Sequence, residues 1–171
     1  MNDVGRVLGA DALKHERARA KARGEVFVFT NGCFDLLHRG HIELLKAAKA
    51  LGDLLAVGLN SDKSVRRIKG RYRPLVSQDH RAVTLAAVRY VDFVVIFEED
   101  TPERIISLLK PDVLVKGSDY QPEEIVGRRE VEAAGGRVVR VPIYGGLSTR
   151  RLMAEIGRRC KDMAGEASDT E

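Results

Sequence analysis

Two histidines, His38 and His41, stand where an apolar segment gives way to an amphipathic one. The apolar segment includes residues 26–29, and the amphipathic run begins at Ile42. This order predicts a strand, a glycine-bearing loop and a helix whose first turn carries both imidazoles on one face. A helix N-terminus offers unpaired N–H groups and a positive dipole end. We therefore expect a phosphate group here and stabilisation of charge on that phosphate.

The residues around the histidines fit a close approach of phosphate to backbone. Gly32 and Gly40 lack side chains at the points where such an approach is needed. Two ordinary histidines at a helix terminus, or half of a metal site, are the alternatives. A structural zinc site needs four ligands. Cys33 would add only one to the two histidines, and no further Cys or His stands at a spacing typical of zinc ligands.

A second glycine-containing segment, residues 145–149, precedes the last expected helix. Ser148 is the expected N-cap, and the hydroxyls of Ser148 and Thr149 can bond the β- and γ-phosphates of a nucleotide. An ordinary glycine loop with a serine cap is the alternative for this segment.

Four motifs occur in a fixed order, and together they resemble the cytidylyltransferase-like nucleotidyltransferases. Members of this superfamily join a nucleoside triphosphate to a phosphorylated small molecule and release pyrophosphate. The likeness is greatest to the heptose 1-phosphate adenylyltransferase branch and covers roughly Glu25 to Ile156. The motifs are the HxGH motif His38-Arg39-Gly40-His41 and the segments 57–62, 115–120 and 146–149.

The resemblance implies a role for individual residues. His38, His41 and Lys69 are expected to be catalytic, and Asp35, Lys69 and Asp119 are expected to contact the acceptor. Asp35 alone is a possible metal contact; capping of the helix start and hydrogen bonding within its own loop are its alternatives. The expected nucleotide contacts are Thr30, Asn31, Gly32, Cys33, Phe34, His38, Gly40, His41, Arg81, Arg89, Lys116, Gly117, Tyr144, Leu147, Ser148 and Thr149.

Some of these assignments have plain alternatives. A solvated basic loop would explain Lys69, and a turn after a strand would explain the segment 116–119. Arg150 stands where the family pattern has a further Ser or Thr, so an arginine charge replaces a hydroxyl there. Arg81 and Arg89 lie eight residues apart on an expected helix and match arginines of the glycerol-phosphate cytidylyltransferases. A cytidylyl- or adenylyltransferase that acts on another phosphorylated acceptor, such as glycerol 3-phosphate or FMN, is therefore the alternative enzyme.

Composition fits one folded domain that binds a small polyanion. The chain has 171 residues, is 44% hydrophobic and carries a formal net charge of +4. Its basic residues are interleaved with acidic ones and only 5% of residues are aromatic, which disfavours a nucleic-acid partner. The sequence contains no apolar run of membrane-spanning length and no secretory signal, so we expect a cytoplasmic protein with no membrane partner. Cys33 and Cys160 are expected to be free thiols.

Strands alternating with helices predict an α/β fold, a single-domain doubly wound parallel sheet of about five strands. We expect a helical extension over 1–24, a nucleotidyltransferase domain over 25–161 and a polar, disordered tail over 162–171. The region 61–73 is expected to be a loop with a short helix. The expected strands are 25–29, 54–59, 93–97, 113–115 and 137–141, and the expected helices are 10–22, 40–51, 77–89, 101–109, 123–134 and one beginning after Ser148.

The resemblance implies an adenylyltransferase that transfers AMP from ATP to D-glycero-D-manno-heptose 1-phosphate. ADP-heptose for lipopolysaccharide or surface glycans, and pyrophosphate, would be the products. Magnesium bound with ATP and a homodimer are expected, as is a separate kinase, because nothing in the chain is long enough to be one. A non-catalytic nucleotide- or nucleic-acid-binding module is the alternative of another class.

Overall fold

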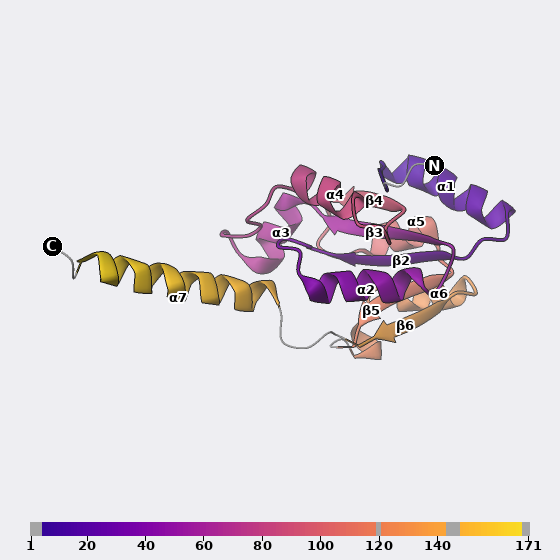
Figure 1. Ribbon diagram of the computed structural model, residues 1–171. Helices are drawn as coiled ribbons and strands as arrows, with labels where there is room; N and C mark the ends of the chain where they lie inside the picture. Colours follow the sequence, from indigo (N-terminus) through magenta and orange to yellow (C-terminus); the bar gives the residue numbers. More distant parts are fainter. Residues whose placement is uncertain (1–4, 119–120, 143–147, 169–171) are drawn as a thin grey trace.

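The protein is a six-stranded parallel sheet covered by helices, with one helix projecting from the body (Figure 1). The computed structural model describes residues 5–118, 121–142 and 148–168. The strands are β1 (Arg6–Val7), β2 (Phe27–Gly32), β3 (Leu54–Asn60), β4 (Phe93–Phe97), β5 (Val113–Gly117) and β6 (Arg137–Val141). The helices are α1 (Ala10–Ala22), α2 (Arg39–Lys49), α3 (Asp62–Lys69), α4 (Gln78–Ala86), α5 (Glu103–Leu109), the 3₁₀ turn η1 (Pro122–Glu124), α6 (Arg128–Ala133) and α7 (Thr149–Ser168).

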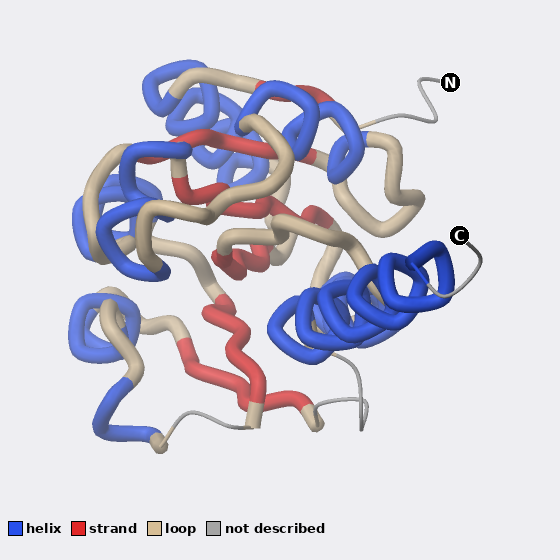
Figure 2. Tube along the Cα trace, turned by 90° about the vertical axis from the view of Figure 1, so that its left-hand side faces the viewer, coloured by secondary structure: helices blue, strands red, loops and turns tan. Residues whose placement is uncertain are grey.

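Strand residues alternate between two apolar layers, one on each face of the sheet. Val28 of β2 packs with Leu45 of α2 and Leu85 of α4, whereas Phe27 and Phe29 face the layer formed with α1, α5 and α6. Helices therefore lie on both sides of the strands (Figure 2). Burial of both faces explains why the strands read as nearly continuous apolar runs in the sequence.

The strand order places one point of the sheet at the centre of the expected site. The order is β1-β4-β3-β2-β5-β6, so the chain moves outward from β2 to β4 and then returns to the other side of β2. In doubly wound sheets, ligands bind beyond the carboxyl ends of the strands at such a reversal. The β2–α2 loop and the end of β5 lie at the carboxyl ends of the strands at this reversal. The parallel strand order confirms the predicted doubly wound α/β fold.

The sheet has six strands instead of about five because β1 adds to its edge. Arg6 pairs with Phe93 and Val7 with Val94, both in parallel register. A strand of two residues has no periodicity to detect, and its pairing partner is distant in the sequence. The helix predicted over 10–22 is confirmed as α1, and β1 precedes it within the expected N-terminal extension.

Two predicted helices are shorter than expected. The helix predicted over 77–89 ends at Ala86, because the chain turns there to enter β4. The helix predicted over 123–134 is split into η1 and α6. The split falls at Gly127, whose φ of 87° favours glycine and where a Cβ would lie 2.5 Å from the Ile106 side chain.

The short helix predicted within 61–73 is confirmed, and the last helix extends into the predicted tail. The polar region after β3 forms the regular helix α3, capped by Ser61, whose Oγ accepts a hydrogen bond from the Ser64 N–H at 3.2 Å. The last helix continues past Lys161 to Ser168. It extends away from the sheet (Figure 1). None of the helices in the described ranges is long and apolar enough to cross a membrane.

Arg17 fixes α1 to the opposite part of the chain. Its guanidinium donates to the carbonyl oxygens of Leu109 and Lys110 and pairs with the Asp112 carboxylate at 2.7 Å. It also lies 5.6 Å from the centre of the Phe27 ring. Because Asp112 in turn accepts from the Phe27 N–H at 2.8 Å, α1 is joined to the starts of both β2 and β5.

Candidate active site

The two histidines lie together at the start of α2. His38 immediately precedes the helix in extended conformation, and His41 is in the first turn. Their rings stack with centroids 3.8 Å apart and planes inclined by 26°. The His38 N–H makes a long hydrogen bond of 3.4 Å to His41 Nδ1. The proton of a neutral His41 ring is therefore on Nε2, where it can be donated to a ligand.

Both imidazoles are kept neutral by their surroundings. Burial, followed by the charge of His38, lowers the pKa of His41 to about 4. Burial also lowers the pKa of His38. Nδ1 of His38 is buried and makes no hydrogen bond within the described ranges. This one unpaired buried nitrogen is available to a polar ligand, and the helix N-terminus beside it favours an anion.

Phe34 packs against the histidine pair and holds an unusual backbone conformation. Its φ is 43°, in the left-handed region that a bulky residue rarely adopts. Its ring centre lies 5.2 Å from that of His41. A Cβ at Gly32 would approach the Phe34 ring to 3.0 Å, so the glycine makes room for this packing. Gly32 and Phe34 were predicted to contact the nucleotide, and that assignment stays a prediction.

Asp35 connects the histidine loop to the segment before α4. The carboxylate is buried and accepts from the N–H groups of Leu75 at 2.8 Å and Val76 at 3.0 Å. It also pairs with Arg73 Nε at 2.5 Å. Burial by itself raises the pKa of this carboxyl, but the hydrogen bonds from Val76, Leu75 and Arg73 bring it below its usual value. Asp35 therefore neither caps α2 nor bonds within its own loop.

Arg73, Leu75 and Val76 were missed at the level of sequence. They lie about forty residues beyond Asp35, and no local pattern links them to it. The nearest signal is Pro74, which marks an extended segment but not its partner.

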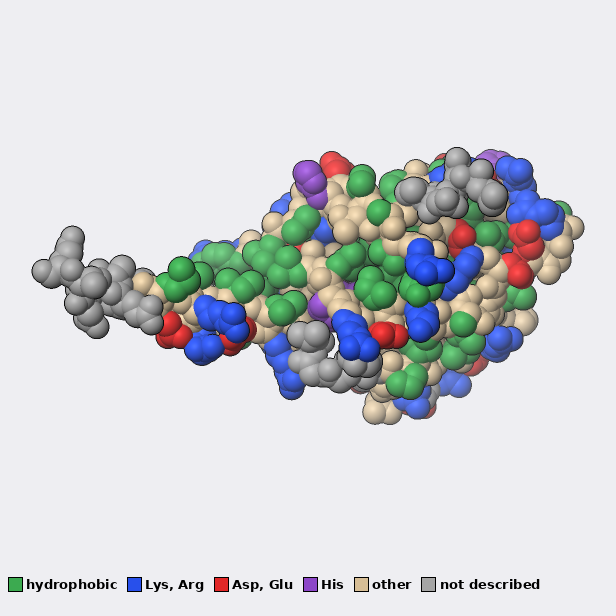
Figure 3. All heavy atoms as spheres, in the orientation of Figure 1, with side chains coloured by type: hydrophobic (Ala, Val, Ile, Leu, Met, Phe, Trp, Pro, Cys, Tyr) green, Lys and Arg blue, Asp and Glu red, His purple; other side chains and the backbone are tan. Residues whose placement is uncertain are grey.

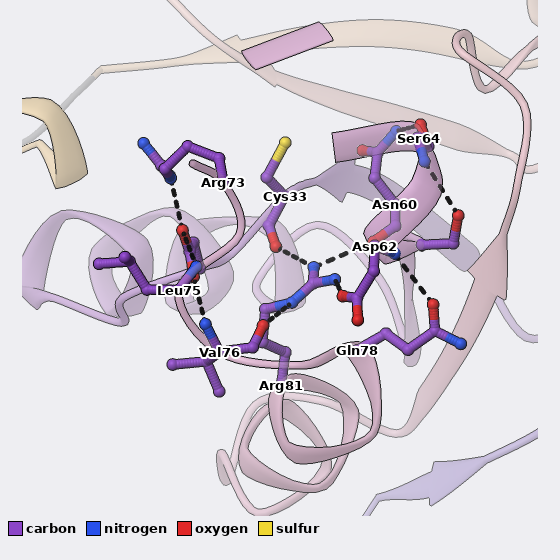
Figure 4. A network of polar contacts seen from close by, with 11 residues as sticks. Cys33, Asn60, Asp62, Ser64, Arg73, Leu75, Val76, Gln78 and Arg81 are labelled. Carbon is purple, nitrogen blue, oxygen red and sulfur yellow. Dashed lines mark hydrogen bonds and ion pairs between the residues drawn. The ribbon is translucent and has the colours of Figure 1, made fainter. Parts of the chain in front are cut away.

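Arg81 is enclosed in the protein and contacts three parts of the chain. Its guanidinium donates to the carbonyl oxygens of Cys33 at 2.5 Å, Asn60 at 2.9 Å and Val76 at 2.9 Å. It also pairs with the Asp62 carboxylate at 2.7 Å, and its side chain is 0% exposed. Figure 4 shows the guanidinium between these groups. This arrangement assigns Arg81 to positioning the loop after β2, whereas a direct nucleotide contact was expected.

The second wall of the site is formed by β2 and β5. Thr30 Oγ1 donates to the Val115 carbonyl at 3.0 Å, and Lys116 Nζ donates to Asn31 Oδ1. Lys116 is buried and Gly117 ends β5, so the lysine charge lies next to the loop that carries the histidines. Asp119, the expected acceptor contact in this motif, lies outside the described residues.

Lys69 reaches the same region from the end of α3. The Lys69 side chain is exposed. Burial raises the pKa of the Cys33 thiol, and the positive charge of Lys69 lowers that pKa more than any other nearby charge does. Cys33 is therefore a protonated thiol whose carbonyl oxygen is held by Arg81. Lys69 is therefore within electrostatic range of the loop that carries Cys33.

The expected contacts at the end of β6 are only partly within the described residues. The Oγ of Ser148 accepts from the Arg151 N–H at 3.2 Å, and its carbonyl accepts from the Leu152 N–H at 3.0 Å. This confirms Ser148 as the N-cap of the last helix, which begins at Thr149. Tyr144 and Leu147 lie outside the described residues.

Arg89 is not brought to the site. It lies in the turn between α4 and β4, at the amino ends of the strands, whereas the histidines lie at the carboxyl ends. Its guanidinium is 5.5 Å from the centre of the Tyr90 ring. The expectation that Arg81 and Arg89 lie on one helix is wrong, because the helix ends before Arg89.

The arrangement can bind a polyphosphate but is a poor metal site on its own. Lys116 contacts Asn31 of β2 and Lys69 acts electrostatically on Cys33, so both cations lie near the β2–α2 loop, where the N-terminus of α2 also favours an anion. Over the described ranges, no three His, Cys, Asp or Glu side chains are grouped as metal ligands require. Asp35 does not fit a magnesium ligand either, because Arg73 and two N–H groups already occupy its oxygen atoms.

Comparisons with known proteins place the chain among nucleotidyltransferase-like sequences. A model of the cytidylyltransferase-like family matches residues 29–152. Bifunctional protein HldE of Citrifermentans bemidjiense is 52% identical over 151 residues, covering 88% of this chain and 31% of that protein. Bifunctional protein HldE of Coxiella burnetii is 50% identical over 150 residues, covering 88% and 32%. The chain thus spans about a third of the length of these relatives.

Solved structures agree with the fold. The lipopolysaccharide core biosynthesis protein from Thermoplasma volcanium GSS1 matches with a TM-score of 0.59 and 30% identity, covering 71% of this chain and 98% of that one. The pantoate-beta-alanine ligase from Francisella tularensis matches with a TM-score of 0.63 and 16% identity, covering 86% and 72%. The second similarity concerns the fold alone.

Proposed function

The chain belongs to the cytidylyltransferase-like family, and from this premise we propose that it transfers AMP from ATP to D-glycero-D-manno-heptose 1-phosphate. The stacked pair of His38 and His41 at the N-terminus of α2 is the observation that carries the proposed reaction type. The identity of about half to bifunctional HldE proteins, together with the segment 115–120, supports the heptose phosphate as acceptor.

The proposed step is an in-line displacement. An oxygen of the acceptor phosphate attacks the α-phosphorus of ATP, and the bond from that phosphorus to the pyrophosphate oxygen breaks. The attacking oxygen is already ionised near pH 7, so no general base is needed and the protein contributes positioning and charge stabilisation. In this proposal the Nε2–H of His41 and the N–H groups of α2 donate to the oxygens that gain charge. His38 supports that ring by stacking on it.

The remaining candidates divide between the two substrates. We assign Lys116 and the hydroxyls of Ser148 and Thr149 to the triphosphate, because they follow β5 and β6 at the carboxyl edge of the sheet. Lys69 is the proposed contact to the acceptor phosphate, reaching the loop from α3. Asp35 and Arg81 act indirectly in this scheme, since their polar groups are used by the protein.

Magnesium is proposed as a companion of ATP. The phosphates themselves supply ligands to this ion, which neutralises their charge when bound. We propose no protein carboxylate as its ligand. A cytoplasmic location and a homodimer are likewise part of the proposal.

The cytidylyltransferase alternative loses its main support in the structure. That alternative depended on Arg81 and Arg89, of which the first is enclosed by protein groups and the second lies at the opposite end of the sheet. Base selection is nevertheless best tested directly.

The decisive experiment measures pyrophosphate release from ATP, CTP, GTP and UTP with each anomer of heptose 1-phosphate, glycerol 3-phosphate and FMN. We expect selective turnover of ATP with a heptose 1-phosphate. Removal of one transition-state hydrogen-bond donor in His41→Ala should lower kcat by about 10²- to 10³-fold. His80→Ala is the matched control, because this exposed histidine lies on α4 outside the site. Turnover of CTP with glycerol 3-phosphate, or equal activity of His41→Ala and wild type, would refute the proposal.

A further inference from the structure

Arg73 is anchored through one of its nitrogens. Its Nε donates to the buried Asp35 carboxylate at 2.5 Å, and its side chain is only 15% exposed. The two terminal nitrogens make no hydrogen bond to any residue that the structure describes. Figure 4 shows the far end of this guanidinium pointing away from the other residues drawn. A guanidinium has five N–H donors, so the donors of the terminal nitrogens are left for another group.

The two arginines that border the β2–α2 loop are used differently. Arg81 donates from Nε and from both terminal nitrogens to groups of the protein. Arg73 donates from Nε alone among the described residues, and this contact to Asp35 holds the plane of its guanidinium. The terminal edge of a guanidinium presents two parallel N–H donors, which match two oxygens of one phosphate group. Arg73 is therefore oriented for a ligand, whereas Arg81 is used up by the fold.

A tight turn joins Arg73 to Lys69. The Arg73 N–H donates to the Gly70 carbonyl at 3.0 Å, and Gly70 has a φ of 96° that favours glycine. Both cations act on the same thiol: burial raises the pKa of Cys33, and the charges of Lys69 and Arg73 lower it. Lys69 makes no hydrogen bond or ion pair within the described ranges. Two cations with available N–H donors therefore lie near the Cys33 loop.

The strand order decides which substrate these two cations meet. β3, which leads to α3 and Lys69, lies on one side of β2, whereas β5 and β6 lie on the other side with Lys116. The histidine pair follows β2, and histidine side chains are visible at the surface where α2 begins (Figure 3). In-line displacement puts the attacking and leaving oxygens on opposite sides of the α-phosphorus. With the pyrophosphate on the β5–β6 side, the attacking phosphate must arrive from the α3 side.

We propose that Arg73, through the terminal edge of its guanidinium, and Lys69 together hold the phosphate of the acceptor. This assignment rests on the proposed nucleotidyl transfer and adds a binding residue to it. Two positive charges suit a phosphate monoester, which carries a charge of about −1.5 to −2 at pH 7 and has three acceptor oxygens. The Arg73 edge binds two of these oxygens, and the remaining one is directed at the α-phosphorus. A carboxylate or a phosphodiester has a single charge, so the site selects acceptors with a terminal phosphate.

Arg73→Lys separates a binding role from a structural one. A lysine keeps a positive charge beside Asp35, but its ammonium cannot also offer a two-donor edge to a phosphate. We expect the KM for heptose 1-phosphate to rise by about tenfold or more, with kcat and the KM for ATP changed by less than about twofold. The midpoint of urea denaturation should stay close to that of wild type.

Arg67→Lys is the matched control for this substitution. The Nε of Arg67 makes a contact of the same length, 2.5 Å, to the Asp100 carboxylate on the exposed surface beyond β4. It should leave both KM values unchanged. An acceptor KM in Arg73→Lys equal to that of wild type would overturn the proposal.

A second measurement does not depend on turnover. In proton–nitrogen correlation spectra of the full chain, the guanidinium signals of Arg73, assigned by their loss in Arg73→Lys, should shift when inorganic phosphate is added. The signals of Arg67 should stay in place. A shift at Arg73 without turnover of heptose 1-phosphate would support the anion site and refute the proposed reaction alone. The absence of a shift at Arg73 in saturating phosphate would overturn the anion site.

Discussion

The β2–α2 side of the candidate site is held by buried polar contacts, whereas the β6–α7 side begins a helix that projects from the body. On the first side, Asp35 and Arg81 each join segments distant in the sequence. On the second, the ion pairs of Arg158 and Arg159 stay within α7. The β2–α2 side of the candidate site is therefore held by contacts between distant segments, whereas these ion pairs of α7 are local to that helix.

The largest expected difference in stability between the two sides is that between Arg81→Met on the β2–α2 side and a substitution on α7. Removing the Arg81 guanidinium leaves the Asp62 carboxylate and the carbonyl groups of Cys33, Asn60 and Val76 without their partner. We expect the free energy of unfolding to fall by about 3–5 kcal/mol in urea denaturation. Arg158→Met, which removes exposed ion pairs on α7, should change it by less than about 0.5 kcal/mol. Equal losses of stability in the two variants would mean that the α7 ion pairs stabilise the protein as much as the Arg81 contacts do.

Lowering the pH should reduce the free energy of unfolding, because His41 on the β2–α2 side must take up a proton. Its folded pKa of about 4 lies below the value of 6.5 for a free imidazole. Between these pH values the unfolded chain binds a proton that the folded chain does not, so stability falls as pH decreases. We expect a loss of about 2–3 kcal/mol between pH 6.5 and 4.5, with His38 acting in the same direction.

The measurement is urea denaturation as a function of pH for wild type and His41→Gln. The variant should show a shallower slope across pH 6.5–4.5, a range above the pKa values of most carboxyl groups. Identical slopes would mean that the His41 ring is not buried as a neutral group.

Asp35→Asn should have an intermediate effect. The amide retains one acceptor oxygen but loses the charge that Arg73 and the Leu75 and Val76 N–H groups share. We expect a loss of about 1.5–3 kcal/mol of stability and faster hydrogen exchange at Leu75 and Val76. Asp79→Asn, on the exposed surface of α4, is the control. Unchanged hydrogen exchange at residues 75–76 would argue against a stabilising role of the Asp35 carboxylate for this segment.

The smallest effect concerns the two serine caps. Ser61 and Ser148 each accept a hydrogen bond of 3.2 Å at the start of a helix, but only Ser61 is buried in the body. Ser61→Ala should lower global stability by about 1 kcal/mol. Ser148→Ala should weaken α7 by a similar amount without moving the global unfolding transition, and its effect should be visible as faster exchange near Arg151. A global change for Ser148→Ala would show that α7 is part of the cooperative core.

The parts of the site that follow directly from local sequence were predictable. The apolar run, the glycines and the spacing of His38 and His41 indicate a strand, a loop and a helix start, and Ser148 has the residue type of a cap. The alternation of strands and helices also indicates a parallel sheet. Each of these features is encoded within a few neighbouring residues.

The parts that depend on distant contacts were not predictable in the same way. Arg81 has the charge of a ligand contact, and only its enclosure by Cys33, Asn60 and Asp62 shows a positioning role. The end of α4 carries no Gly or Pro to mark it, so Arg89 was placed on the wrong element. The edge strand β1 exists only because β4 is available to pair with it.

Arg17 sets a limit on how the chain can be shortened for engineering. A polypeptide starting at Glu25 would keep every residue of the candidate site. It would nevertheless strip Leu13 and Ala20 from the apolar layer and leave the Asp112 carboxylate without its cationic partner. The minimal unit for fusion or transplantation therefore includes α1, and the motifs of the candidate site alone do not delimit it.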